Sequence, residues 1–290
     1  MTKNDVYSEV TDRIIDALEA GTVPWRKTWK STGGAGPVNV RTARPYRGIN
    51  VFLLELQSMS AGYTDPRWGT YKAITEAGGQ VRKGEKGTRV ILWKPVKKEA
   101  TDEQDGAGYL LLRQYTVFNV EQADGIEPLP APERTFDPRA EADRIIEGYA
   151  SPRGPAVVFR GSQPAYSIER DLVYSPEPDN FDGGDEYYVT MFHELAHSTG
   201  HEKRLGRIEP ALFGSDPYAK EELVAEMTAA MLAGLAGIEA TQENSAAYIG
   251  SWLRRLKDDR KLVVQAAAQA QKAAYLILGE TGDKSLAEAA

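Results

Sequence analysis

The chain of 290 residues contains no cysteine and only three histidines. The absence of cysteine excludes disulfide bonds, thiolate metal sites and cysteine nucleophiles, and it is compatible with a reducing compartment. The chain also lacks a run of about 18 apolar residues, the length that a membrane-spanning helix needs. Its first 21 residues are charged and amphipathic, without the apolar segment of a signal peptide. We therefore expect a cytoplasmic protein that has no membrane partner.

The three histidines all lie within nine residues, in the segment HELAHSTGH at 193–201. His193, Glu194 and His197 form an HExxH motif, and residues four apart lie on one face of a helix, so both imidazoles can bind one ion. A chance pair of histidines on a surface helix is the alternative, and the clustering of every histidine argues against it. Glu194 follows the first ligand and is the predicted catalytic general base.

A catalytic zinc site needs three protein ligands and an open position. His201 is a poor third ligand, because on a continuous helix it lies about 12 Å along the axis from His193. It would reach the ion only if the helix broke sharply at Gly200. We therefore look for the third ligand elsewhere in the chain.

The segment from Tyr218 to Leu232 has the apolar spacing of an amphipathic helix, and Glu222 and Glu226 lie four residues apart on it. We predict Glu222 as the third ligand and Glu226 as the residue that supports a histidine ligand, an arrangement that resembles gluzincins. The assignment of Glu226 as the ligand stays open, and Glu221 is expected to be solvated. The predicted cofactor is one divalent metal ion, zinc first and manganese as the alternative.

Charge is distributed unevenly along the chain. Between Thr22 and Lys98, 15 lysine and arginine residues stand against 4 aspartate and glutamate residues, although the whole chain has a net charge of −7. The remaining residues therefore carry an excess of 18 negative charges. This segregation predicts two halves with different partners, and a polyanion as the partner of the basic half.

Aromatic residues are interleaved with this basic segment, including four of the five tryptophans. A positive groove with exposed rings suits single-stranded nucleic acid, because each base can stack on a ring and each phosphate can be neutralised. The alternative is that the rings form the core of a small domain. No helix-turn-helix or zinc-finger pattern for reading duplex DNA is evident. The predicted nucleic-acid-binding residues are Trp25, Arg26, Arg44, Tyr46, Arg47, Arg67, Trp68, Lys72, Arg82, Lys83 and Lys86.

The basic half has the pattern of a small α+β domain. Helices are expected over residues 1–20, from about residue 50 and near 71–77. A strand over 88–96 and the segment YLLLRQYTVFNV at 109–120 are typical of a hairpin.

A proline-rich segment separates the two halves. Residues 125–138 contain four prolines and show no periodicity, which is typical of a linker. We therefore predict an N-terminal domain over 1–125, a linker over 126–137 and a C-terminal domain over 138–290.

The C-terminal half combines helices with a few short strands. A strand next to a zincin cleft can pair with a substrate peptide, and residues 167–174 are the predicted strand for this role. The expected elements are a helix over 138–149, strands over 156–160 and 165–174, the HExxH helix, the helix from 218, and two closing helices between 245 and 278.

Several motifs together resemble ArdC-type antirestriction proteins. Trp25, Pro37 and Asn39, with RPYRGIN (44–50), DPRWGTYK (65–72) and GGQVRKGEKGT (78–88), are similar to the N-terminal domain of that family. HELAHSTGHEKRLGR (193–207), followed by YAKEELVAE (218–226), is similar to its zincin-like metallopeptidase domain. The resemblance extends over nearly the whole chain, in the same order.

The resemblance implies a small α+β domain that binds single-stranded DNA, joined to a metallopeptidase domain related to the SprT and ImmA/IrrE zincins. Such a protein would be carried by a plasmid or phage and would protect DNA that enters by conjugation or infection from host restriction. A host protein is the implied peptidase substrate. In this family of folds the third metal ligand varies, so Glu222 stays an inference.

Two other functions are compatible with these residues. The chain could be a pure coating protein for single-stranded DNA, with a metal site that serves only folding. It could also be a nuclease, because a metal motif and a basic groove coexist. Nucleases that use magnesium prefer carboxylate-rich sites, which disfavours this last reading.

Overall fold

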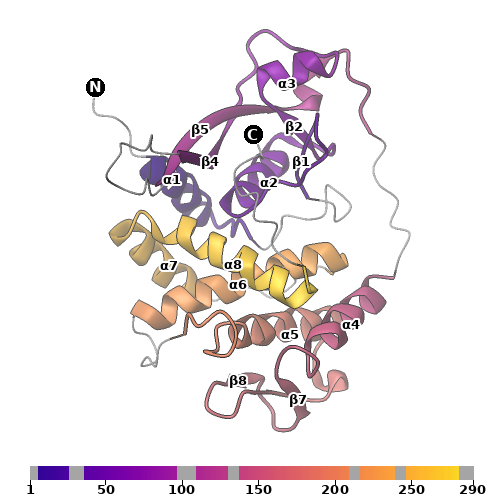
Figure 1. The fold of residues 1–290 in the computed structure, drawn as a ribbon, viewed down its shortest axis with the longest axis vertical. Coiled ribbons are helices and arrows are strands. Elements are labelled where there is room, and N and C mark those ends of the chain that lie inside the picture. Colours follow the sequence, from indigo (N-terminus) through magenta and orange to yellow (C-terminus); the bar gives the residue numbers. More distant parts are fainter. Residues whose placement is uncertain are drawn as a thin grey trace, which may run out of the picture.

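The computed structural model describes residues 6–25, 36–96, 109–129, 137–208, 216–238 and 246–280. Helices and strands alternate irregularly, which makes an α+β fold, as predicted. The strands of the N-terminal half lie at one end of the long axis and the sheet that contains β7 and β8 lies at the other, with a helical layer between them (Figure 1).

Three helices and two sheets form the described part of the N-terminal half. The larger sheet has the strand order β1-β2-β5-β4, in which β1 and β2 are parallel and the other neighbours are antiparallel. Strands β3 and β6 form a separate antiparallel pair. The elements are α1 (Val6–Glu19), β1 (Val38–Asn39), α2 (Ile49–Ala61), β2 (Arg67–Gly69), α3 (Tyr71–Glu76), β3 (Gln80–Val81), β4 (Thr88–Val96), β5 (Tyr109–Asn119) and β6 (Ala123–Asp124).

Local signals explain where these elements begin and end. Helix α2 ends at Gly62, which adopts the left-handed conformation that closes many helices. Helix α3 begins after Thr70, whose side chain accepts a hydrogen bond from the backbone N–H of Ala73. The predicted hairpin is confirmed, because β4 pairs with β5 along its whole length, from Thr88 opposite Val117 to Val96 opposite Tyr109.

In the described part of the C-terminal half, five helices form a layer and one three-stranded sheet of order β7-β9-β8 lies beside α5. Strand β7 is parallel to the central strand β9, and β8 is antiparallel to it. None of the described helices combines the length and apolarity needed to cross a bilayer. The elements are α4 (Pro138–Tyr149), β7 (Ala156–Phe159), β8 (Ala165–Ser167), β9 (Leu172–Ser175), α5 (Gly184–Ser198), α6 (Asp216–Ala236), α7 (Ala246–Asp258) and α8 (Leu262–Leu278).

The strand predicted over 165–174 is two strands, and the prediction that 167–174 pairs with a substrate is therefore wrong. The chain turns between Ser167 and Leu172, where Asp171 adopts a positive φ of 51°. Aspartate tolerates this conformation better than most residues, so IERD at 168–171 is a turn. Strand β9 then lies between two neighbours, and the outer strands β7 and β8 each leave one edge unpaired in the described sheet.

The largest hydrophobic core is shared by both halves. Helix α1 packs on α7 and α8, and α2 packs on α8. Residues on both sides of the predicted linker contribute to one cluster, including Ile14, Trp25 and Phe52 from the N-terminal half and Trp252 and Val263 from the C-terminal half. The sequence boundary therefore does not separate two independent cores. Residues 130–136 of the predicted linker lie outside the described residues.

Candidate metal centre and nucleic-acid surface

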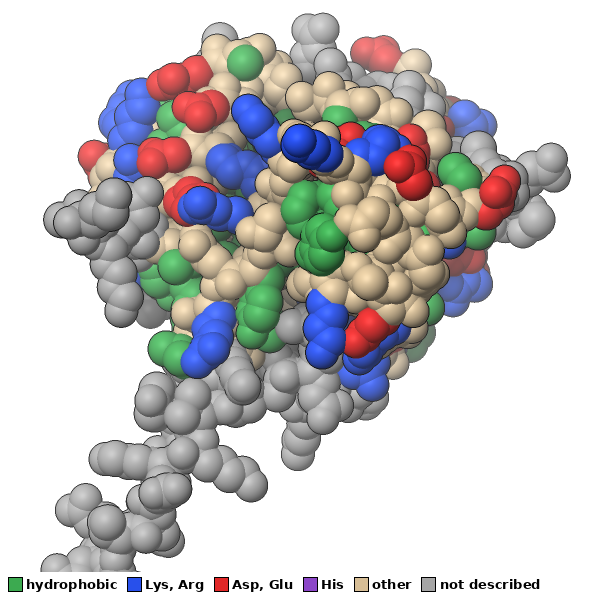
Figure 2. Space-filling view, turned by 90° about the horizontal axis from the view of Figure 1, so that it is seen from above, with side chains coloured by type: hydrophobic (Ala, Val, Ile, Leu, Met, Phe, Trp, Pro, Cys, Tyr) green, Lys and Arg blue, Asp and Glu red, His purple; other side chains and the backbone are tan. Residues whose placement is uncertain are grey.

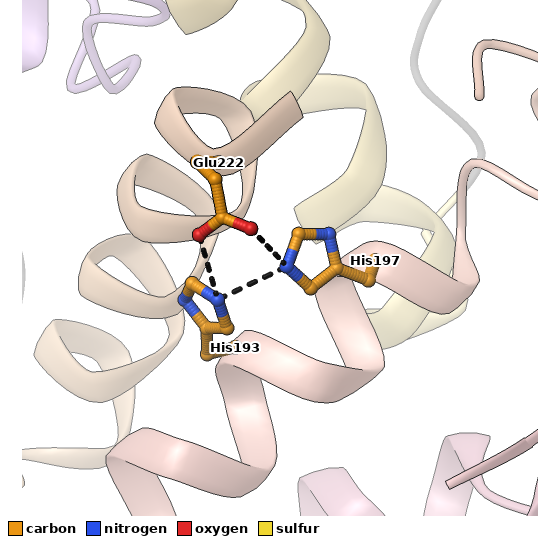
Figure 3. A group of neighbouring side chains, drawn as sticks. All are labelled: His193, His197 and Glu222. Carbon is orange, nitrogen blue, oxygen red and sulfur yellow. Dashed lines mark hydrogen bonds and ion pairs between the residues drawn. The ribbon is translucent and has the colours of Figure 1, made fainter. Parts of the chain in front are cut away.

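Helices α5 and α6 bring the three predicted metal ligands together (Figure 3). His193 and His197 lie on α5 and Glu222 lies on α6, and one ligand atom from each falls within 4.8 Å of the others. The two Nε2 atoms are 3.0 Å apart. Each Nε2 is 3.5 Å from one carboxylate oxygen of Glu222.

These separations fit a shared divalent ion. Ligand atoms at about 2.0–2.2 Å from one tetrahedral zinc ion lie roughly 3.3–3.6 Å from one another, and the observed separations are 3.0–3.5 Å. Two imidazole nitrogens and one carboxylate oxygen are also a donor set that zinc and related transition metals accept. The residues present therefore fit a divalent metal ion with an open position.

Each histidine turns its other ring nitrogen toward a carboxylate of α6. His197 Nδ1 donates to Glu221 Oε1 at 3.2 Å, and His193 Nδ1 lies 3.9 Å from Glu226 Oε1. Carboxylates in this position fix the ring orientation and leave the opposite nitrogen free to bind a metal. The place of Glu226 fits the supporting role predicted for it.

Glu221 is held inside the site, so the expectation that it is solvated is wrong. Arg207 donates to both of its oxygens, from Nε at 2.9 Å and from Nη2 at 2.8 Å. Arg207 also donates to the carbonyl of Ala196 and the hydroxyl of Thr199, at the end of α5. Both side chains of the pair are at most 14% exposed. Arg207 thus fixes the carboxylate that fixes His197.

A close backbone contact just after α5 positions Arg207 beside Glu221. After α5 the chain folds back, and the N–H groups of Arg207 and Ile208 donate to the carbonyl of Gly200 at 3.0 and 3.1 Å. A Cβ atom on Gly200 would collide with the Ile208 side chain. Glycine is therefore required here for packing, just after the end of α5 at Ser198. Sequence spacing on α6 alone could not reveal this contact.

The carboxylates of the site favour a positive charge on or beside the two histidines. Burial works against a charged His197, but the contacts with Glu221 and Glu222 outweigh it and raise the pKa of His197 to about 10. Burial would raise the pKa of Glu222, yet the hydrogen bonds from the two histidines hold that pKa well below its usual range. Either a bound cation or a proton on the imidazoles can supply this positive charge.

Glu194, the predicted general base, faces the edge strand of the small sheet. Its Oε2 accepts a hydrogen bond from the backbone N–H of Tyr166 on β8, at 2.7 Å. Glu194 is half-buried and directly follows His193. The carboxylate therefore lies between the metal ligands and the unpaired edge of β8.

A second network, which the sequence analysis missed, ties β8 to the end of α5. Tyr166 Oη donates to Asp171 at 2.8 Å, and Arg204 binds both oxygens of Asp171. Arg204 Nε donates to the carbonyl of Ser198 at 2.7 Å. His201 is buried nearby, and its Nδ1 accepts from the N–H of Lys203, outside the metal-ligand group. The network holds the edge strand in a fixed position beside Glu194.

Of the three tryptophans considered for base stacking, Trp25 and Trp68 are buried, so this part of the prediction is wrong, and Trp29 lies outside the described residues. Trp25 is 0% exposed and its ring lies 5.2 Å from that of Trp252. Trp68 is also 0% exposed, with its ring 5.9 Å from that of Tyr63. A ring without exposed surface cannot accept a base. The alternative considered from the sequence, that these rings form the core, holds for both.

Three further residues that were predicted to bind nucleic acid contact other parts of the protein instead. Arg67 pairs with the fully buried carboxylate of Asp65 at 2.6 Å. Tyr46 is half-buried and its hydroxyl reaches the carbonyl of Trp68. Arg47 lies over the ring of Tyr275 on α8, 5.5 Å from its centre. These side chains stabilise the fold or the contact between the halves, and Arg67 in particular is not available to a phosphate.

The remaining predicted basic residues are exposed, apart from Arg26, which lies outside the described residues. Figure 2 looks onto the N-terminal end of the molecule, where lysine and arginine side chains lie around exposed apolar ones, with some acidic side chains among them. Lys72 is 3.7 Å from Glu76, and Arg82 pairs with Glu85 at 3.1 Å. The exposed set is Arg44, Lys72, Arg82, Lys83 and Lys86.

Comparison with protein families divides the chain into two matched parts. Residues 4–118 match the N-terminal domain of the anti-restriction factor ArdC. Residues 142–269 match a family of zincin-like metallopeptidases. The two matches together cover most of the chain.

Solved structures and curated proteins give the same picture. The antirestriction ArdC protein from the R388 plasmid, in a metal-free crystal structure, superposes with a TM-score of 0.78 at 38% identity, over 94% of this chain and 96% of that one. A Mn(II)-bound structure of the same protein matches with a TM-score of 0.78 at 37% identity, over 97% and 100%. The chain is 37% identical to the uncharacterized protein y4eC of Sinorhizobium fredii, over 97% of this chain and 94% of that protein.

DNA primase TraC of Escherichia coli is a longer relative. The identity is 38% over 95% of this chain, which spans only 27% of that primase. The match is therefore confined to about a quarter of the primase.

Proposed function

The chain belongs to the ArdC family of antirestriction proteins, and on that basis we propose that it binds single-stranded DNA through its basic N-terminal half and protects incoming plasmid or phage DNA from host restriction. The observation that carries the proposal is the exposed basic set of the N-terminal half, Arg44, Lys72, Arg82, Lys83 and Lys86. Helix α3, which contains Lys72, lies at the end of the molecule away from α5 (Figure 1). We place DNA binding in residues 1–125 and the metallopeptidase function in 138–290, joined by 126–137.

The second part of the proposal is a single divalent metal ion bound by His193, His197 and Glu222. Zinc is the first expectation from the donor set, and manganese is the alternative, supported by the Mn(II)-bound structure of the R388 relative. Such an ion, when bound, would supply Lewis-acid polarisation of a peptide carbonyl. Loading the purified chain with zinc or manganese and measuring the stoichiometry tests this part directly.

The protein's own residues then have defined roles in peptide hydrolysis. Glu194 would take a proton from the attacking water, as a general base within reach of the ligands. The unpaired edge of β8 would hold an extended substrate segment as an added strand, which replaces the 167–174 strand expected from the sequence. Glu194 accepts from Tyr166 on that same strand, and this contact supports their joint role. A host protein is the proposed substrate.

A pure coating protein with a structural metal is the second candidate function. Its support is the position of the metal ligands, which join α5 to α6 inside the C-terminal helical layer, where a metal ion would stabilise the packing.

One comparison separates the two functions. We would compare the wild type with Glu194→Gln for binding of single-stranded DNA, metal content, cleavage of host proteins and protection of DNA from restriction. The peptidase function requires that Glu194→Gln keep DNA and metal but lose cleavage and protection. Full protection by Glu194→Gln would favour the coating protein, and a wild type that binds no single-stranded DNA would contradict both.

A further inference from the structure

An open concavity on the N-terminal end combines an exposed aromatic ring with basic side chains. Its volume is about 530 Å³, within the range of roughly 300–1,000 Å³ that small-molecule sites occupy. The side chains that matter for its chemistry are Tyr71, Gln80, Val81, Arg82, Lys83 and Phe118. It lies beside α3 and β3, on the end of the molecule that Figure 2 shows.

Tyr71 supplies a flat surface that is already fixed in place. Its side chain is 50% exposed, the highest value among the exposed large hydrophobic residues of the described chain. The phenol oxygen is hydrogen-bonded to Nε2 of Gln80, and Gln80 pairs with Asp124 in the two-stranded sheet. A ring anchored at its hydroxyl loses little rotational freedom when a base stacks on it, so less of the stacking energy is lost to ordering.

The charged side chains around the ring balance in number, so the position of Lys83 is what matters. Glu85 and Asp124 also line the concavity, and Arg82, 3.1 Å from Glu85 and 3.5 Å from Asp124, offsets one of their two charges. Glu85 accepts a further hydrogen bond from Gln122. Lys83 is exposed and has no ion-pair partner among the residues that the structure describes. Its charge is therefore available to a phosphate.

We propose that this concavity holds one nucleobase of single-stranded DNA, stacked on Tyr71, with Lys83 on the adjoining phosphate. Val81 and Phe118 give the concavity apolar walls that suit the body of a base. Bases of a duplex are already stacked on both faces, so the site selects single strands. The inference rests on the proposed function, because it names where the N-terminal half contacts its DNA. Tyr71 takes the role that the sequence analysis gave to Trp25 and Trp68.

Binding of the full chain to an oligonucleotide of about 16 thymidines, the upper site size of a single-strand-binding fold, tests the proposal. Stacking of one base is worth about 1–3 kcal/mol, so Tyr71→Ala should weaken binding by roughly 5- to 150-fold. Tyr71→Phe keeps the ring and loses only the hydroxyl anchor, so it should weaken binding less than Tyr71→Ala does. Phe159→Ala, which removes an exposed ring on β7, is the matched control and should have no effect.

Two further binding measurements separate the stacking contact from the phosphate contact. An abasic oligonucleotide of the same length offers phosphates without bases, so Tyr71→Ala should bind it as well as the wild type does. Lys83→Ala should weaken binding to both the thymidine and the abasic strands. Because Tyr71 is exposed, its variants should keep the wild-type melting temperature, which checks that they fold.

The outcomes separate this proposal from the function on which it rests. A wild type that binds no single-stranded DNA contradicts the proposed function. A wild type that binds, together with a Tyr71→Ala variant of equal affinity, overturns the Tyr71 site alone. Equal weakening of Tyr71→Ala on thymidine and abasic strands also overturns it, because the ring would then not act through a base.

Discussion

The metal centre and the concavity beside Tyr71, here called the Tyr71 surface, differ in how firmly their side chains are held before a ligand binds. At the metal centre each histidine faces a carboxylate of α6, and Arg207, which binds one of these carboxylates, is itself bound at the end of α5. At the Tyr71 surface one ring is fixed, while cations such as Lys83 lie exposed on long side chains.

This difference teaches where single substitutions should matter. Buried contacts that depend on one another are lost together, because removing one group leaves its partners buried without a hydrogen-bond or charge partner. Exposed charges contribute separately and are screened by salt, so each one adds a small and nearly independent share. The following predictions test that contrast, from the largest expected effect to the smallest.

His193→Ala should abolish metal binding, because it removes one of three ligands from a site that has only two others. Metal content after dialysis against zinc or manganese, measured by mass spectrometry, checks this. His201→Ala is the matched control and should keep the wild-type stoichiometry, since His201 lies outside the ligand group. Retained metal in the first variant, or lost metal in the second, would contradict the ligand assignment.

Arg67→Ala should destabilise the fold by about 3–5 kcal/mol, because it leaves the buried carboxylate of Asp65 without its counterion. Urea unfolding followed by circular dichroism measures this loss. Lys83→Ala, in the same basic half, should leave the free energy of unfolding within about 0.5 kcal/mol of the wild type. Similar stability of the two variants would remove the distinction between structural and DNA-facing cations.

Glu221→Gln should weaken metal affinity by about 10- to 100-fold, the usual cost of losing a group that orients a metal-binding histidine. Competition with a chelating dye measures the affinity. Glu202→Gln removes an exposed carboxylate just beyond α5 and serves as the control. An unchanged affinity in Glu221→Gln would mean that the contact with Arg207 serves packing alone.

Asp171→Asn should cost about 1–3 kcal/mol of stability at neutral pH, because Arg204 loses its charged partner. The hydrogen bond from Arg204 holds the pKa of Asp171 below its ordinary value. The ionised carboxylate therefore stabilises the fold fully above about pH 4, and this contribution is lost as pH falls through the lower folded pKa. Unfolding free energies of both proteins at several pH values should converge in acid, and a constant difference would argue against the ion pair.

Lys83→Ala should have the smallest effect, a loss of a few-fold in affinity for single-stranded DNA. Each phosphate contact adds about 0.7 to the slope of log affinity against log salt for single strands, so the slope should fall by about that amount. Titrations at several salt concentrations measure it. An unchanged slope with a lower affinity would show that Lys83 acts without contacting a phosphate.

The sequence predicted elements well where the local pattern was strong. The bounds of β4 and α4 agree with the expected ranges, because a run of β-branched and aromatic residues after Gly87 defines the first and Asp137 with Pro138 opens the second. The HExxH spacing likewise anticipated the pairing of His193 with His197. These features depend on residues close together in the chain.

Two of the failures, at Trp25 and Glu221, concern contacts between distant residues. Trp25 stands beside Arg26 in sequence, yet its ring packs against Trp252, more than two hundred residues away. Glu221 has the spacing of a surface residue on α6, and only the fold of the chain after Gly200 brings Arg207 to it. Exposure and ion pairing at such positions are decided by tertiary structure, which periodicity does not contain.

The core that both halves share has a thermodynamic consequence. Helices α1 and α2 bury their apolar faces on α7 and α8, so neither half can unfold without exposing the other. A ligand that binds only the native state stabilises everything that unfolds with its site. A metal ion between α5 and α6 and a DNA strand on Tyr71 would thus protect each other's binding sites by mass action, without any change of shape. Removing the metal with a chelator would then lower the fraction of molecules that are folded and able to bind DNA.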